Sequence, residues 1–168
     1  LLGVEVFVAG PELVHVEQAA PILAQMPLSR IVELLQFKPG ESGRHAVRIA
    51  GVVLDSHSQG STYLRDSTGA VLIQHHEPIA LKAGDEVELF GFPKQGEYSP
   101  VVDHAVIQKL KSGPPPKPVH ADPEKILDQG LYSQLVEFDA FLADQSASPL
   151  YQFLILQSGC RLIAARLQ

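Results

Sequence analysis

Short runs of alternating or β-branched apolar residues fill the middle of the chain and predict five strands. Clusters of Gly, Ser, Thr and Lys between the runs are typical of turns. Gly51 and Gly91 stand inside two of the runs, where a sharp bend or a bulge is needed. Short strands at this spacing favour a small closed barrel of the OB-fold type over a flat sheet. The runs are residues 46–54, 61–66, 70–76, 85–92 and 101–111.

Two short segments have helical spacing instead. Apolar residues recur three and four positions apart in residues 28–36, and Lys38-Pro39-Gly40 ends that pattern. A second helix is expected to begin at Asp122, a residue type that caps helices, because Pro123 follows at the first helical position.

The chain also contains an internal repeat. The string LRDSTGAVLI, residues 64–73, matches LILQSGCRLI, residues 154–163, at an offset of about 90 positions. Residues 1–20 resemble the last two strands of such a unit, and residues 132–168 resemble the first three. We therefore predict a mainly β chain with two OB-fold-like five-stranded barrels in tandem and short connecting helices. Residues 21–118 form the complete barrel with its preceding helix, and residues 1–20 plus 119–168 form the second, because separate ends would leave strand edges unpaired.

Composition narrows the function classes. The 168 residues are 45% hydrophobic and 19% charged, which excludes a disordered chain. A net charge of -6 with scattered basic residues argues against a general nucleic-acid binder. Cys160 is the single cysteine, so no internal disulfide forms. The apolar runs are shorter than the ~20 residues of a membrane helix, so any membrane segment is expected outside this sequence. The sequence begins inside one apolar run and stops directly after another, so we expect it to be a piece of a longer protein.

Several strings resemble a known family. VRIAGVVL, STYLRDSTGAVLIQ and LKAGDEVELFGFPKQGEYSPVV are similar to the tandem OB-like sensory modules in the extracytoplasmic N-terminal regions of bacterial sensor histidine kinases and diguanylate cyclases. The resemblance covers about residues 28–165. Arg65 stands where the family pattern usually has Gln, and Ala70 where it often has Gly. The resemblance implies the OB-like fold and a periplasmic position in an inner-membrane protein, but it does not identify a ligand.

A ligand surface is expected where OB folds usually have one, on the second and third strands together with two neighbouring loops. The turn motifs Asp66-Ser67-Thr68-Gly69 and Ala83-Gly84-Asp85 are interpreted as structural, because their residue types satisfy turn backbones. The candidate ligand-binding residues are Tyr63, Arg65, Gln74, His75, Lys94 and Tyr98.

Metal binding and catalysis have weaker support. His75 and His76 point to opposite faces of a strand, and Asp103 and His104 are expected to diverge by the same alternation. A pair such as His75 with His104 across neighbouring strands is a candidate for zinc or for pH sensing, but a zinc site needs further ligands. We assign no metal, no cofactor and no catalytic residue, since no nucleophile elbow, phosphate loop or metalloprotease motif is present.

Three function classes remain. The first is a non-catalytic sensory or ligand-binding module whose state passes through a membrane segment to a kinase or cyclase. The second is a structural or protein-interaction module, including dimerisation through the parent protein. The third is a binder of oligosaccharide or single-stranded nucleic acid, a common OB role, which the acidic charge and the absence of Trp disfavour. The expected partner is a small ligand or another protein.

Overall fold

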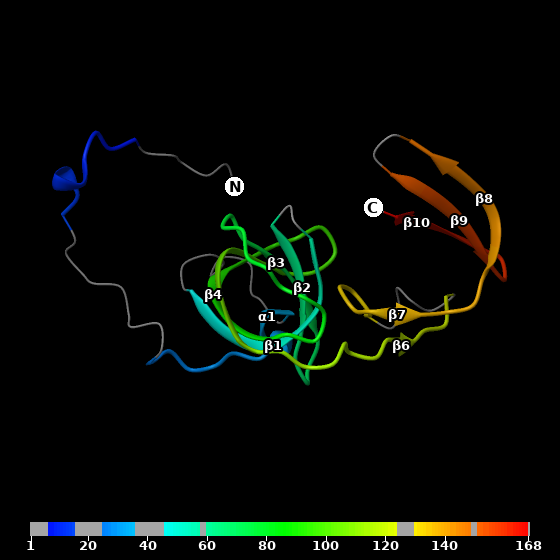
Figure 1. The fold of residues 1–168 in the computed structure, drawn as a ribbon, viewed down its shortest axis with the longest axis horizontal. Coiled ribbons are helices and arrows are strands. Elements are labelled where there is room, and N and C mark those ends of the chain that lie inside the picture. The colour runs from blue at the N-terminus through cyan, green and yellow to red at the C-terminus, as the bar shows by residue number, and fades with distance from the viewer. Residues whose placement is uncertain are drawn as a thin grey trace.

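A closed barrel and a separate three-stranded sheet make up the two halves of the chain (Figure 1). The computed structural model describes residues 7–15, 25–35, 46–57, 60–123, 130–148 and 151–167. None of the helices within these ranges is long and apolar enough to cross a membrane.

Five strands close the barrel in the order β1-β2-β3-β5-β4. The contact between β3 and β5 is parallel, and every other pair in the barrel is antiparallel. This closed, five-stranded arrangement is that of an OB-like barrel, and it confirms the mainly β prediction and the five predicted strands. The bounds are β1 (Val47–His57), β2 (Ser61–Arg65), β3 (Ala70–Gln74), β4 (Glu86–Lys94) and β5 (Val101–Lys111).

Alternation along the strands fills the barrel. In β4 the buried Val87 and Leu89 alternate with Glu86 and Glu88, so one face of the strand points inward and the other outward. The predicted helix is present as α1 (Ile31–Leu35). The fully buried core side chains include Ile31, Ile49, Val53, Leu64, Ile73, Val87, Leu89 and Val102.

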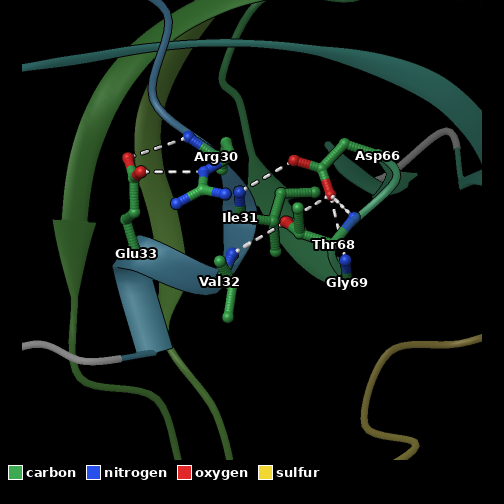
Figure 2. Close-up of polar contacts among 7 residues, drawn as sticks. All are labelled: Arg30, Ile31, Val32, Glu33, Asp66, Thr68 and Gly69. Carbon is green, nitrogen blue, oxygen red and sulfur yellow. Dashed lines mark hydrogen bonds and ion pairs between the residues drawn. The ribbon is translucent and has the colours of Figure 1, made fainter.

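The turn between β2 and β3 holds the beginning of α1 (Figure 2). The Oδ2 atom of Asp66 accepts a hydrogen bond from the backbone N–H of Ile31 at 2.9 Å, and Thr68 Oγ1 accepts one from Val32 at 3.1 Å. The other carboxylate oxygen, Oδ1, accepts hydrogen bonds from the backbone N–H groups of Thr68 and Gly69 and from the Thr68 hydroxyl. Asp66 therefore shapes the turn and also satisfies one helix donor, while Thr68 satisfies a second, and neither donor has a partner within the helix.

The turn before β4 is structural as well. Gly84 has a φ of 94°, which favours glycine. Asp85 is 2% exposed, and its Oδ2 accepts hydrogen bonds from Lys109 Nζ at 2.6 Å and from the backbone N–H of Lys82 at 2.9 Å. The hydrogen bond from Lys109, followed by the one from Lys82, lowers the pKa of Asp85 to about 2. The carboxylate is thus charged and paired at neutral pH.

Both glycines inside strands lie where another chain segment approaches closely. A Cβ atom on Gly51 would lie 2.6 Å from the carbonyl oxygen of Arg65, and one on Gly91 would lie 2.5 Å from Cγ1 of Val102. Gly91 also lies at the register shift between β4 and β5, as its position in the sequence predicted.

The second half of the chain repeats the first strands of the barrel. Three antiparallel strands follow the order β10-β9-β8, with β8 at Phe141–Ala147, β9 at Gln152–Ser158 and β10 at Arg161–Leu167. The bulge of β1 between Val53 and Asp55 recurs in β8 between Leu142 and Asp144. Each of these two aspartates accepts a hydrogen bond at 2.8 Å from the backbone N–H of the next residue. The connection from β9 to β10 is shorter than that from β2 to β3, because pairing goes on to Ser158 with Arg161 whereas the first hairpin ends at Arg65 with Ala70.

The assembly of a second barrel from residues 1–20 and 119–168 stays a prediction. Within residues 7–15 the structure has a 3-10 helix, Pro11–Leu13, and no strand. The parallel pair of β6 (Val119–His120) with β7 (Val136–Glu137) lies between the barrel and β8. The helix expected after Asp122 falls on residues 124–129, which lie outside the described residues.

The cap on α1 makes a first prediction. Replacing Asp66 by Ala removes the acceptor for Ile31 and for the turn, and we expect the free energy of unfolding to fall by about 1–2 kcal/mol in urea denaturation. The exposed Asp139→Ala serves as the control and should change little. An Asp66→Ala variant as stable as the control would contradict the capping role.

The same carboxylate makes stability depend on pH. Burial raises the pKa of Asp66, but hydrogen bonds from Ile31, Thr68 and Gly69 outweigh it and lower the pKa below its usual value. The stabilisation is therefore complete above the unfolded value near 4 and is lost as pH falls through the folded value. Asp66→Asn keeps an acceptor but does not titrate, so its unfolding free energy should fall less steeply below pH 4 than that of the wild type.

Deletion tests the second barrel. If residues 1–20 complete the unit of β8–β10, deleting them should speed amide hydrogen exchange in residues 152–167 and leave exchange in β1–β5 unchanged. Equal exchange in β9 and β10 with and without residues 1–20 would show that the two chain ends do not pair.

Candidate functional site

Four of the six residues predicted to bind a ligand, Tyr63, Arg65, His75 and Tyr98, each line a different hollow on the barrel. Arg65 lines a hollow over β1 and the start of β4, whereas Tyr63 lines another with Ser133 and Gln134. Gln74 is half-buried at the end of β3, paired with Ser61. No two of the six line the same hollow among those described, so the structure does not bring them together as one site.

His75 lies inside the barrel wall, only 7% exposed. Its Nδ1 lies 2.8 Å from the carbonyl oxygen of Glu77, which only accepts, so this nitrogen donates. Its Nε2 then accepts from the hydroxyl of Thr62 at 3.2 Å, and that hydroxyl in turn accepts from Ser56 at 2.9 Å. Both ring nitrogens are engaged within the protein.

Tyr98 lines a hollow formed by both halves of the chain. This cleft of about 540 Å³ lies between the barrel and the segment that leads into the second half of the chain. The barrel contributes the β2–β3 turn and the loop between β4 and β5, and the second half contributes the turn at residues 130–134. The lining residues are Thr68, Gly69, Ala70, Gln95, Tyr98, Ser99, Pro100, Gly130, Leu131, Tyr132 and Gln134.

Two tyrosine rings stand parallel in this cleft. The rings of Tyr98 and Tyr132 lie 4° from parallel with centroids 6.4 Å apart. Tyr98 is 71% exposed, and its hydrogen bond with Glu97 raises the pKa of its hydroxyl above the usual value. Flat, exposed tyrosine faces present a large apolar surface with few rotatable bonds, which suits the binding of a planar ring or a sugar face.

Gln134, which lines this cleft and also the hollow beside Tyr63, carries an unsatisfied polar atom. Oε1 of Gln134 is shielded from solvent, and among the described residues no group donates a hydrogen bond to it. Such an atom costs free energy unless it finds a donor. A ligand N–H or O–H group would supply that donor once the amide turns toward the cleft, since the oxygen itself is shielded from solvent.

The strand β5 departs from alternation at its centre. His104 has a φ of 50° opposite Gly91, and its Nδ1 lies 3.3 Å from Oδ2 of Asp103. The expectation that these two side chains diverge was therefore wrong, because the bulge turns both to one side. Lys94 Nζ contacts the same Oδ2 at 2.7 Å. It is His76, not His75, whose ring reaches His104, with centroids 4.9 Å apart.

Sequence reasoning missed Tyr132, Gln134 and His76. Tyr132 and Gln134 belong to the second half of the chain, and no periodicity signals that their turn returns to the barrel. The positive φ of Ser133, 61°, shows that this turn is tight, but serine gives no such signal in a sequence.

Comparisons with known proteins give only distant likeness. No protein-family model matches the chain, and no curated protein does. Among solved structures, the hypothetical protein ygiW from E. coli is similar over 50% of this chain and 90% of its own, with 15% identity and a TM-score of 0.42. The telomere capping protein Ten1 from Saccharomyces pombe is similar over 50% of this chain and 80% of its own, with 20% identity and a TM-score of 0.39. Likeness at this level says nothing about what this chain binds.

The unsatisfied amide makes a prediction about the protein without ligand. Gln134→Met keeps a similar volume and removes the buried oxygen, so we expect a thermal midpoint equal to or above that of the wild type. The exposed Gln145→Met is the matched control and should leave the midpoint unchanged. A clear loss of stability specific to Gln134→Met would mean that the amide already has a partner.

Proposed function

We propose that this chain is a non-catalytic ligand-binding module with a sensory role in a larger signalling protein. The observation that carries the proposal is the cleft that joins the barrel to the second half of the chain, with Gln134 Oε1 unsatisfied beside the tyrosine pair. OB-like barrels are common scaffolds of small binding modules, which supports the choice by analogy.

The lining supports one chemical class of ligand. Tyr98 and Tyr132 favour a flat ring or a sugar face, Gln134 Oε1 requires a donor, and Gln95 adds an amide at the rim. Among the described residues that line this cleft there is no lysine or arginine, and the chain carries a net charge of -6. The expected ligand is thus a small neutral or cationic polar molecule rather than a phosphate-rich one.

The position of the cleft suggests how binding is read out. Its two walls come from segments that are neighbours in space but separated by β5 and the proline-rich stretch at residues 114–118. A ligand that contacts both walls binds one arrangement of the two halves better than others, and it shifts their populations accordingly. Any signal passed onward would be that change of arrangement.

The resemblance of the strand strings supports an extracytoplasmic placement. In that reading the parent is an inner-membrane histidine kinase or diguanylate cyclase, and the chain lies in the periplasm. Fractionation of cells that express the parent protein would test this placement separately from ligand binding.

A specific observation favours the protein-interaction alternative. The β8–β10 sheet exposes large apolar side chains, among them Phe141 at 82% and Leu162 at 68%. Exposed apolar surface on a sheet with open edges is typical of a contact surface.

A ligand screen tests the sensory proposal. We expect sugars or planar polar metabolites to raise the thermal midpoint of the wild type, since a ligand that binds only the native state stabilises it. Tyr132→Ala and Gln134→Met should each lower the affinity of the active compound by roughly tenfold, because each removes a contact worth about 1–2 kcal/mol.

The controls separate the cleft from the rest of the protein. Tyr151→Ala changes a tyrosine outside the cleft and should bind as the wild type does. Equal affinity in all variants would place the ligand elsewhere. If no compound shifts the midpoint, the protein-interaction alternative gains.

A further inference from the structure

We propose that His76, Asp103 and His104 form a binding site for one zinc ion, separate from the tyrosine cleft and independent of the proposed function. Each residue offers one ligand atom, and the three atoms all lie within 4.8 Å of one another. Two imidazoles and a carboxylate with open positions form a ligand set that zinc uses in proteins, with water completing the coordination.

The geometry of the Asp103–His104 pair matches that requirement. Zinc bonds of about 2.0–2.1 Å in a tetrahedral arrangement place neighbouring ligand atoms roughly 3.3 Å apart. His104 Nδ1 and Asp103 Oδ2 lie 3.3 Å apart. His76 and His104 are exposed, so a small rotation of each ring brings the third nitrogen into range.

The backbone is shaped for this arrangement. Adjacent residues on a regular strand point to opposite faces, and only the bulge at His104, with its φ of 50°, brings the two side chains together. A non-glycine residue in this conformation carries strain, and such strain is often found at functional sites. The backbone N–H of His104 also donates to Oδ1 of Asp103 at 2.9 Å, which orients the carboxylate and leaves Oδ2 toward the histidine.

The Asp103 carboxylate already pairs with the ammonium group of Lys94. Lys94 Nζ lies 2.7 Å from Oδ2, and its side chain is 47% exposed. Zinc has to displace this ammonium, which can turn out into solvent. Lys94 therefore weakens zinc binding, and its removal should strengthen it.

The site lies at the seam of the barrel. His76 follows β3, and Asp103 and His104 belong to β5. These two strands pair over only two register positions, Leu72 with Val101 and Ile73 with Val102. A zinc ion on these residues links the two strands beyond that short contact, so it should raise the stability of the closed barrel.

Calorimetric titration of the tag-free protein with zinc chloride tests the site. We expect one zinc ion per chain, a higher thermal midpoint with zinc, and no comparable binding of Mg²⁺ or Ca²⁺, which prefer oxygen ligands. His76→Ala and His104→Gly should each weaken binding at least tenfold. Lys94→Met should tighten it.

The variants keep the test decisive. Glycine accepts a positive φ, so His104→Gly removes a ligand without adding strain, and its zinc-free midpoint should not fall. His120→Ala removes an exposed histidine elsewhere and should bind zinc as the wild type does. Wild-type affinity in both His76→Ala and His104→Gly would overturn the proposal, and so would the absence of zinc binding up to about 1 mM.

Discussion

The link between the β2–β3 turn and the N-terminus of α1 fixes the helix on the barrel and so places Ile31 in the barrel core. Asp66 and Thr68 accept hydrogen bonds from residues 35 and 36 positions earlier in the chain. They thereby hold Ile31, which is fully buried among the barrel side chains. A five-residue helix is too short to be stable by itself, so its place is determined by this cap and by the burial of Ile31.

The strands were predictable because burial on one face leaves a period of two in the sequence. The five strands of the barrel begin and end within a few residues of the apolar runs, and Gly91 correctly indicated a bulge. The helix cap was not predictable, since its acceptors lie far away in the sequence. The turn Asp66-Ser67-Thr68-Gly69 was rightly interpreted as structural, but its second role appears only when α1 is in place.

The candidate sites show where strand alternation no longer predicts the direction of a side chain. Alternation correctly separated His75 from His76, one directed inward and the other outward. The same rule failed at Asp103 and His104, because a single residue with positive φ reverses the direction of a side chain. The predicted ligand residues do not share one hollow. The strands of a closed barrel curve and twist, so residues that are neighbours when the sheet is drawn flat face different directions.

The two halves of the chain show that local sequence determines a hairpin with its bulge but not a closed barrel. Val53, Leu64 and Val71 are successive cross-strand neighbours in the barrel, and Leu142, Leu156 and Ile163 hold the corresponding places beside the bulge of β8.

The burial of these two sets differs sharply. The first three are at most 2% exposed, whereas Leu142 is 55% exposed and the other two are only half-buried. The residue types are equally apolar, so the difference comes from β4 and β5, which cover the first set and have no described counterpart over the second. The free energy that stabilises the barrel is therefore supplied mainly by closure, and the β8–β10 sheet gains it only from strands that cover the same positions.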